Sequence, residues 1–491
     1  MTTTSRRSLI GGTLAVAGTW LLGACTSPAP TGPPSSSPRP LPTPVPATPG
    51  PGGTVIEKTL RAAPTTVDLG GRLVDTWAYG DIVPGPPLEA RAGDVLRITL
   101  DNQLPADTTI HWHGIAIANA ADGVPGLTQQ PVVPRSNYLY EFVVPDPGTY
   151  FFHPHVGVQL DRGLYAPLII TDPAEPGRSD AEWVVVLDDW IDGTGRTPDD
   201  ALRELTTNPS TPRGGMGGMD HMNMGPPPFG EAGDVAHPYF LINGALPTAP
   251  VSYRGTPGQR LRIRIINAAS DTIFAVALGG HTLTVTHTDG FPVEPHNTDA
   301  LYVGMGERYD AVVTLADGVF PLVARPWGKD GQAIALVRTA SGSAPPAGIA
   351  LPEFDRPIVQ GTDLHPAESV RLPQRQVDAR VGLELGGQMN PYVWTMNGLP
   401  FSQNPRPLEV TEGQRLQIDV TNATMMTHPV HVHGHTFALP SGLRKDTVLV
   451  PPMGITSLQL EATNPGDWAI HCHNIYHAEA GMMIALQYQR G

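Results

Sequence analysis

The stretch HCHNIYHAEAGMM, residues 471 to 483, lies near the C-terminus and combines three histidines, one cysteine and two methionines. Alternate side chains of a β-strand share a face, so His471 and His473 point one way and Cys472 the other. A cysteine thiolate with nearby imidazoles and the thioether of Met482 is the ligand set of a blue-copper electron-transfer site. We therefore interpret the stretch as two metal sites joined by a short covalent path.

Three segments of the chain repeat one pattern. GDVLRITLDN begins at Gly93, GQRLRIRIIN at Gly258 and GQRLQIDVTN at Gly413. Each leads from a glycine turn along an alternating apolar strand to an asparagine, and the copies are spaced almost evenly. The repeat predicts three domains of the same β architecture.

The repeat also predicts where metal ligands lie. In the first and third copies, the asparagine (Asn102 or Asn422) is followed at the same interval by an HxH pair, and a second HxH pair follows a later glycine. The middle copy has Val276 in the equivalent place and no HxH pair. Two non-adjacent copies must therefore meet to form one site. Their histidines are His111, His113, His153, His155, His431, His433, His471 and His473.

Only the third copy carries the cysteine site. Aligned on the repeat, its four candidate ligands correspond to four other residue types in the first copy. Cys472 aligns with Pro154, His477 with Gln159, His428 with Thr108 and Met482 with Leu164. This contrast argues against a random scatter of histidines.

Four motifs carry a resemblance to a known family. HWHG (111–114), HPH (153–155), HPVHVHGH (428–435) and HCHNIYHAEAGMM resemble the copper motifs of the three-domain multicopper oxidases, which include laccases and bacterial cuprous oxidases. The resemblance extends over nearly all of the chain from DTWAYGDIVPGPPLE onward. It implies an all-β fold of three cupredoxin-like Greek-key β-barrels, at residues 54–175, 180–345 and 353–491.

The resemblance implies a role for each ligand, with one type 1, one type 2 and a pair of type 3 copper ions. His428, Cys472 and His477 would bind the type 1 copper, with Met482 axial. His111 and His431 would hold the type 2 copper. One type 3 copper would take His113, His153 and His473, and the other His155, His433 and His471.

The implied reaction couples two half-reactions. Phenols, aromatic amines or Cu(I) would lose one electron at a time at the type 1 copper, and Cys472 would pass the electrons on. O2 would be reduced to water by four electrons at the three-copper cluster. The partners are thus O2 and a small reducing substrate.

Asp122 lies in ADGVPG, shortly after His113. In the family an acidic residue here helps protonate reduced oxygen, so the resemblance implies a catalytic role for Asp122; the alternative is an ordinary Asp-Gly turn. A second relay carboxylate follows the cysteine in many family members. Ile475 and Ala478 occupy those places here, and Glu479 is one residue away.

The run GGMGGMDHMNMG (214–225) concentrates methionine in a glycine-rich segment. Thioethers prefer soft Cu(I), so the run is interpreted as an accessory Cu(I) site; a disordered insertion is the alternative. The accessory ligands would be Met216, Met219, His221, Met222 and Met224. Deleting residues 214–225 without any loss of Cu(I) oxidation would rule out this role.

The N-terminal region predicts export. Residues 1–25 combine twin arginines, an apolar run and the sequence LGAC, which resembles a twin-arginine-type lipoprotein signal with a lipid on Cys25. An ordinary signal peptide is the alternative. Residues 26–53 are proline-rich and predict an extended stalk. We expect a cell-surface lipoprotein on the outer face of the cytoplasmic membrane, or a secreted or periplasmic protein, that contacts membrane only through Cys25.

Composition and net charge further restrict the classes of function and of partner. The net charge of −15 argues against nucleic acid as a partner. Glycine and proline, 54 of each, suit many short strands joined by turns. The rival functions are a non-catalytic copper-binding or exported scaffold protein with the cupredoxin fold, and a copper nitrite reductase, against which the eight HxH histidines count. The sequence leaves the oligomeric state open.

Overall fold

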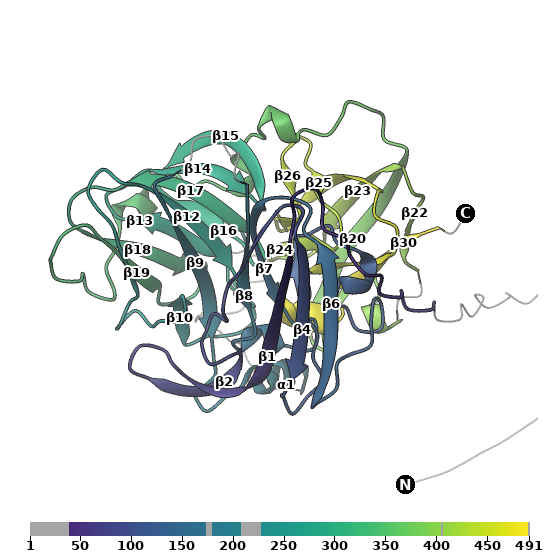
Figure 1. The fold of residues 1–491 in the computed structure, drawn as a ribbon, viewed down its shortest axis with the longest axis horizontal. Coiled ribbons are helices and arrows are strands. Elements are labelled where there is room, and N and C mark those ends of the chain that lie inside the picture. The colour runs from purple at the N-terminus through teal and green to yellow at the C-terminus, as the bar shows by residue number, and fades with distance from the viewer. Residues whose placement is uncertain (1–38, 173–178, 208–226, 404–405, 490–491) are drawn as a thin grey trace, which may run out of the picture. The chain divides into compact units, whose positions relative to one another are not determined.

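The computed structural model describes residues 39–172, 179–207, 227–403 and 406–489. These ranges contain six β-sheets, and each copy of the sequence repeat contributes two of them (Figure 1). The predicted all-β fold of three cupredoxin-like barrels is confirmed. Residues 1–25, with Cys25, and the methionine-rich run 214–225 lie outside the described residues.

The region of the first copy, from Val55 to Thr171, folds into eight strands. They are β1 (Val55–Asp68), β2 (Leu73–Tyr79), β3 (Leu88–Arg91), β4 (Val95–Asn102), β5 (His111–His113), β6 (Ser136–Val143), β7 (Gly148–His153) and β8 (Ala166–Thr171). One sheet has the order β2-β1-β4-β6 and the other β3-β8-β7-β5. The parallel pairs β1–β4 and β3–β8 lie among antiparallel ones, which makes both sheets mixed.

The middle copy folds in the same way with more strands. They are β9 (Ala181–Trp190), β10 (Tyr239–Ile242), β11 (Ser252–Arg254), β12 (Arg260–Asn267), β13 (Phe274–Leu278), β14 (Leu283–Thr288), β15 (Phe291–Thr298), β16 (Leu301–Val303), β17 (Arg308–Thr314), β18 (Val319–Pro326) and β19 (Ala333–Arg338). The sheet orders are β10-β9-β12-β17-β14-β15 and β11-β19-β18-β13-β16. The parallel pairs recur as β9–β12 and β11–β19.

The third copy repeats this arrangement. Its strands are β20 (Ala379–Met389), β21 (Tyr392–Met396), β22 (Leu408–Val410), β23 (Arg415–Asn422), β24 (His428–Val432), β25 (Phe437–Ala438), β26 (Arg444–Lys445), β27 (Thr447–Val450), β28 (Ile455–Glu461), β29 (Asp467–Cys472) and β30 (Met483–Tyr488). The sheet orders are β21-β20-β23-β28-β25-β26 and β22-β30-β29-β24-β27.

Helices are short and few in the described ranges. Two are α-helical, α1 (Pro198–Thr207) and α2 (Ile475–Glu479). Six are single 3₁₀ turns: η1 (Asn119–Ala121), η2 (Gln159–Asp161), η3 (Pro352–Asp355), η4 (Gly361–Asp363), η5 (Glu368–Val370) and η6 (Phe401–Gln403). Within the described part of the chain, none has the length and apolarity that crossing a membrane requires.

The asparagine at the end of each repeat motif has one structural role in all three copies. Asn102, Asn267 and Asn422 are buried at the ends of β4, β12 and β23. Each side-chain oxygen accepts a hydrogen bond, 2.9 Å long, from the backbone amide two residues later. Each side-chain amide donates to two or more backbone carbonyls, one in the loop that follows the strand and one from a segment further along the chain. The repeat signature is thus a loop clamp.

The register of the sheets places the HxH pairs together. His111 of β5 is paired with His153 of β7, and His431 of β24 with His471 of β29. Directly paired side chains lie roughly 5 Å apart across a sheet. Val276 holds the same place on β13 and faces an alanine of β18. Each outer copy therefore builds half of a histidine cluster, whereas the middle copy builds apolar core there.

Buried charges join the first copy to the middle one. Strand β7 contacts β12 and β17. Thr149 donates a hydrogen bond to Asp310 (2.7 Å), and Arg264 donates both to Thr149 (2.8 Å) and to Asp310 (3.0 Å). Burial alone would raise the pKa of Asp310, but Arg262 and Arg264 lower it to about 2. Asp310 is therefore an anion shared across this contact.

The segment between the second and third sheet pairs packs on the middle copy. The amide of Val359 donates to the Ala300 carbonyl (3.1 Å), and the amide of Tyr302 donates to the Val359 carbonyl (2.8 Å). The first strand of the third pair of sheets begins at Ala379. The domain boundaries at residues 54–175, 180–345 and 353–491 stay predictions.

We expect Asn267→Ala to lower the free energy of unfolding by about 2–4 kcal/mol, because it deletes three buried hydrogen bonds and leaves their backbone partners unsatisfied. Equilibrium denaturation of the metal-free protein measures the change. Asn297→Ala is the control, since Asn297 is exposed on β15 and its loss should cost at most about 0.5 kcal/mol. Equal effects of the two substitutions would show that Asn267 is not a clamp.

Candidate metal centres

The first candidate site joins three side chains of the third copy. His428 begins β24, Cys472 ends β29 and His477 lies in α2. The sulfur of Cys472 is 3.6 Å from Nδ1 of His428 and 3.6 Å from Nδ1 of His477, and the two nitrogens are 3.1 Å apart. All three residues are buried. One sulfur and two imidazole nitrogens thus converge on one point.

Each imidazole of this site is oriented by a partner on its far side. Nε2 of His428 hydrogen-bonds the hydroxyl of Thr424 at 2.7 Å, and Nε2 of His477 hydrogen-bonds the carboxylate of Asp234 at 3.0 Å. The Trp394 ring lies against both imidazoles, 4.0 Å from the centre of His477. Such outer contacts fix which nitrogen faces the metal. Here they leave Nδ1 of both rings pointing inward.

The protonation states suit a site that is completed by a metal. Burial raises the pKa of the Cys472 thiol, so the metal-free site holds a neutral thiol. Burial and the neighbouring His477 lower the pKa of His428, which is therefore an uncharged donor. A bound cation deprotonates a coordinating thiol outright. The donor set is the one that copper takes in blue-copper sites.

The backbone of Met482 hydrogen-bonds the backbones of two residues of the sulfur site, His477 and Cys472. Its amide donates to the carbonyl of His477 (2.9 Å), and its carbonyl accepts from the amide of Cys472 (3.0 Å). The Met482 side chain is fully buried, whereas Met483 begins β30 and is half-buried. The axial role of Met482 stays a prediction that this placement favours.

The equivalent place in the first copy is a neutral polar contact. Thr108 and Gln159, which align with His428 and His477, are both buried and hydrogen-bond each other at 2.7 Å. Leu164, which aligns with Met482, is fully buried. The first copy thus has a side-chain hydrogen bond where the third copy has two metal donors.

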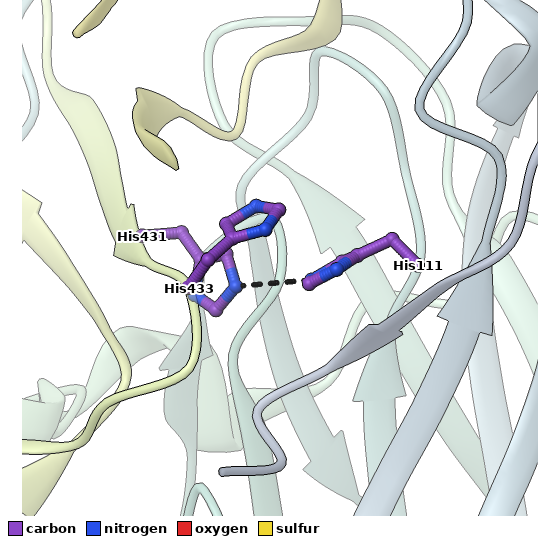
Figure 2. A group of neighbouring side chains, drawn as sticks. All are labelled: His111, His431 and His433. Atoms are coloured by element: carbon purple, nitrogen blue, oxygen red, sulfur yellow. Dashed lines mark hydrogen bonds between the residues drawn. The ribbon is translucent and has the colours of Figure 1, made fainter. Parts of the chain in front are cut away.

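The second candidate site brings together histidines of the first and third copies. Nε2 of His111 is 3.4 Å from Nε2 of His431, and the ring of His111 stacks on that of His433 with centres 3.7 Å apart (Figure 2). The ring of His113 stacks on that of His431 at 3.8 Å. All eight HxH histidines are buried. The two outer copies therefore meet at their histidines.

Potential ligand atoms fall into groups that would hold an ion. Three such groups are each within 4.8 Å: His111 with His431 and His433, His111 with His113 and His153, and His155 with His433 and His471. His473 lies beside two of the same rings, with ring centres 4.8 Å from His113 and 5.2 Å from His153.

Several ring nitrogens of the cluster are buried with no hydrogen-bond partner in the described part of the chain. These are Nδ1 of His113, Nε2 of His153, Nε2 of His155 and both nitrogens of His473. An unsatisfied buried polar atom costs about 1–3 kcal/mol, so such a concentration needs a ligand to complete it. The residues present therefore fit bound copper.

The opposite nitrogens of most rings are held by the protein. Nδ1 of His111, His153, His431 and His471 each donates to a backbone carbonyl at 2.8–3.0 Å. Nδ1 of His433 donates to the Asp122 carboxylate at 3.1 Å. These bonds turn Nε2 of each ring toward the centre of the cluster.

Desolvation sets the charge of the cluster. Burial, followed by the neighbouring imidazoles in most cases, lowers the pKa of seven of its histidines: His113, His153, His155, His431, His433, His471 (to about 3) and His473. These rings are neutral at pH 7 and keep a lone pair for a metal. Neutral imidazole is the form that binds metals.

Asp122 touches two of the cluster rings. Its carboxylate is 3.1 Å from Nδ1 of His433 and 3.2 Å from Nδ1 of His111, and Asp122 is buried. It therefore orients these two rings directly; its role in proton delivery stays a prediction. Glu479, by contrast, is exposed at the end of α2.

Sequence reasoning missed several residues that hold the two sites. Asp446 and Thr447 hydrogen-bond His113 and His431, and Asp234 hydrogen-bonds His477. Each is a single residue without a spacing pattern, far along the chain from at least one of its partners. Only a carboxylate next to a metal motif, as at Asp122, gave a signal.

A small hollow lies against His477. Its volume is about 20 Å³, and its lining includes Glu231, Met305, Met426 and Asp271 besides His477. Asp271 is neutralised by Lys329, whose amine lies 2.9 Å away. The exposed Glu231 and two buried methionines thus form an electron-rich surface beside the sulfur site.

Comparisons with known proteins agree with this geometry. Three family models described as multicopper oxidase match residues 62–175, 182–343 and 375–491. The chain is 44% identical to the multicopper oxidase MmcO of Mycobacterium tuberculosis, over 99% of this chain and 96% of that protein. It is 28% identical to a copper resistance protein A homolog of Pseudomonas syringae pv. tomato, over 98% of each.

A solved structure shows the same fold. The crystal structure of Fet3p, described as a multicopper oxidase that functions in iron import, superposes with a TM-score of 0.77. The match covers 89% of this chain and 90% of that one at 20% identity, so it speaks for the fold alone.

Acid should destabilise the metal-free protein. Unfolded histidine has a pKa of about 6.5, and folding lowers the pKa of the buried rings, for His471 to about 3. Below about pH 6.5 the unfolded chain therefore binds more protons than the folded one, and stability falls as the pH falls. Calorimetry should give a lower unfolding temperature at about pH 5.5 than at about pH 7.5. An unchanged temperature would show that these imidazoles are not held neutral.

Proposed function

Because the chain belongs to the multicopper oxidases and is a copper-dependent oxidoreductase, we propose that it oxidises Cu(I) at the cysteine site and reduces O2 to water at the histidine cluster. Copper bound at these residues would accept single electrons at the sulfur site and supply four of them to O2 at the cluster. We propose the ligand division that the motifs imply, with His111 and His431 as the type 2 pair. Their Nε2 separation of 3.4 Å supports it.

The observation that carries the choice of substrate is the hollow beside His477. A volume of about 20 Å³ has room for a water molecule or a bare ion and none for an aromatic ring. Nε2 of His477 is itself covered by Asp234. Methionine thioethers at Met305 and Met426 favour a soft cation such as Cu(I), and the Glu231 carboxylate adds charge attraction.

The covalent chain supports electron transfer between the sites. Cys472 is bonded through the backbone to His471 and to His473, and both flanking rings belong to the histidine cluster. An electron that reaches the sulfur is therefore one peptide unit from either flanking histidine.

The contacts of Asp122 support a role in proton delivery. Reduction of O2 to water consumes four protons for every four electrons. Asp122 is the buried acid that touches both His111 and His433, so a proton held there is one hydrogen bond from the cluster rings. In the metal-free protein the same contact holds both rings in place.

We also propose that the enzyme works outside the cytoplasmic membrane, anchored by a lipid at Cys25. Support comes from the sequence of residues 1–53 alone. The accessory Cu(I) site in residues 214–225 is likewise a proposal from composition.

Oxygen uptake tests the choice of substrate. We expect Cu(I) to drive faster uptake than a phenol at equal concentration, and Cys472→Ser to abolish both along with the intense blue thiolate-to-copper absorption. Phenol oxidation that outpaces Cu(I) oxidation would identify a laccase instead.

A second prediction concerns the residues that line the hollow beside His477. Glu231→Gln combined with Met426→Leu should lower kcat/KM for Cu(I) roughly tenfold, equivalent to about 1.4 kcal/mol, because the pair supplies charge and a soft ligand. Met389→Leu is the control, since Met389 is exposed on β20. No difference between the double variant and the control would exclude the hollow as the entry site.

A further inference from the structure

The middle copy, which has no HxH pair, reaches the histidine cluster through one turn. Residues 304–307 connect β16 to β17, and Arg308 is the first residue of β17. Gly306 in this turn has a positive φ of +82°, and a Cβ there would lie 2.9 Å from Cδ2 of His473 and 3.0 Å from Cε1 of His113. Backbone of the middle copy therefore packs directly on two rings of the cluster, with no room for a side chain.

Arg308, which follows this turn, binds Asp446 of the third copy through both arms of its guanidinium. Nη1 donates to Oδ1 at 2.7 Å and Nη2 to Oδ2 at 2.6 Å. The remaining donors bond the carbonyls of Thr149 (3.0 Å), in the first copy, and of Gly306 (3.0 Å). Arg308 is fully buried and joins all three copies.

The shortest ion pair of Arg308 is the one with Asp446, at 2.6 Å, and its Nη1 also lies 3.6 Å from Asp289. Lys445, the neighbour of Asp446 in sequence, pairs instead with Asp289 (3.0 Å) and Glu307 (3.1 Å). Among the described residues, Arg308 is the one arginine or lysine within salt-bridge distance of Asp446. A buried carboxylate held by a bidentate guanidinium is anionic and accepts hydrogen bonds only.

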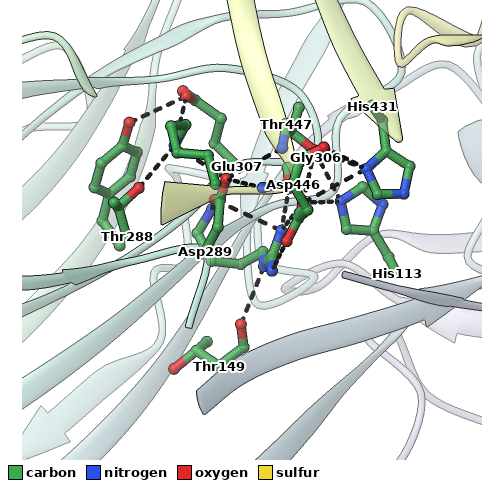
Figure 3. Close-up of polar contacts among 12 residues, drawn as sticks. His113, Thr149, Thr288, Asp289, Gly306, Glu307, His431, Asp446 and Thr447 are labelled. Carbon is green, nitrogen blue, oxygen red and sulfur yellow. Dashed lines mark hydrogen bonds and ion pairs between the residues drawn. The ribbon is translucent and has the colours of Figure 1, made fainter. Parts of the chain in front are cut away.

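Asp446 and its neighbour Thr447 in turn hold two rings of the cluster (Figure 3). The Thr447 hydroxyl donates its hydrogen to Oδ1 of Asp446 at 2.9 Å. Oγ1 of Thr447 and Oδ1 of Asp446 are therefore both acceptors toward the histidines. Nε2 of His113 lies 3.2 Å from Oδ1 of Asp446 and 3.1 Å from the Thr447 hydroxyl. Nδ1 of His431 lies 2.9 Å from the Asp446 carbonyl and 3.1 Å from the same hydroxyl.

This arrangement turns His113 the opposite way from its neighbours. His111, His153, His431 and His471 give Nδ1 to the protein, whereas His113 gives Nε2 and leaves Nδ1 buried without a partner among the described residues. Which ring nitrogen binds a metal is set by the hydrogen bond that the other one makes. The anionic Asp446 therefore selects Nδ1 of His113 as the donor.

We propose that Arg308 is a positioning residue for the histidine cluster: its two-armed bond to Asp446 fixes the acceptor that orients His113 and His431 for metal binding. The middle copy thus contributes to a cluster to which it gives no ligand. This inference rests on the proposed copper cluster. Neither His113 nor His431 belongs to the group of His428, Cys472 and His477 that converges at the sulfur site, so we expect that site to keep its ligands.

The test uses copper-loaded Arg308→Lys. Lysine keeps the charge but cannot form the planar two-armed bond. Loss of an outer partner typically weakens metal binding roughly 10–100-fold. We therefore expect cluster copper to be removed at a correspondingly lower chelator concentration, with a changed electron paramagnetic resonance signal of the type 2 copper. The blue absorption per chain should equal that of the unsubstituted protein.

Arg264→Lys is the matched control. Arg264 is also buried, and its hydrogen bonds go to Glu182, Thr149 and Asp310 rather than to any of the eight cluster histidines. Its replacement should lower the unfolding temperature without moving the chelator midpoint. Equal midpoints for the two variants, or an Arg308→Lys midpoint equal to that of the unsubstituted protein, would overturn the proposal.

Two further arms keep the test decisive. If Arg308→Lys does not fold, Thr447→Val removes one acceptor from both rings with little change of shape, and a chelator midpoint that stays unchanged would overturn the proposal. If the unsubstituted protein binds copper at the cysteine site alone, the proposed function fails before the variants are compared. Failure of the cluster and failure of the Arg308 role are thereby distinguished.

Discussion

The structure depends on a cluster of buried imidazoles, five of whose ring nitrogens have no hydrogen-bond partner in the described part of the chain. Nε2 of His111 and Nε2 of His431 lie 3.4 Å apart where the first and third copies meet. Neutral rings can be buried more cheaply than charged ones, but each unpaired nitrogen still carries a desolvation cost of about 1–3 kcal/mol. Metal binding offsets that cost, so the association of the two outer copies and metal binding are thermodynamically linked.

The three copies of the β architecture contribute differently to the two metal sites. The third copy supplies the cysteine site and half of the histidine cluster, the first supplies the other half, and the middle supplies no ligand to either. In the first copy Thr108 and Gln159 occupy the positions equivalent to His428 and His477 and hydrogen-bond each other. The middle copy fills the equivalent strand with Val276 and contributes contacts around both sites through the turn at residues 304–307.

Much of this architecture could be predicted from sequence because it depends on local periodicity. The HxH spacing places two rings on one face of a strand whatever the rest of the fold, and the repeat aligned Val276 with the ligand positions. The clamp role of Asn267 and its two counterparts was visible as a pattern without a mechanism. A strand register explains why His111 pairs with His153.

The supporting groups could not be predicted in this way. Asp446 and His113 are 333 residues apart, and Arg308 and Asp446 are 138 apart. Their contacts exist only once three barrels are packed, and neither residue has a spacing that marks it. Asp234 is hidden for the same reason, since its partner His477 is 243 residues away. Tertiary packing, rather than local propensity, selects these residues.

Anomalous X-ray scattering from a crystal of the copper-loaded protein, recorded at the copper edge, would locate each copper ion. We expect one peak between His428, Cys472 and His477 and a separate group of three among the eight histidines of the two outer copies. A single peak at Cys472 with no copper among those histidines would contradict that arrangement.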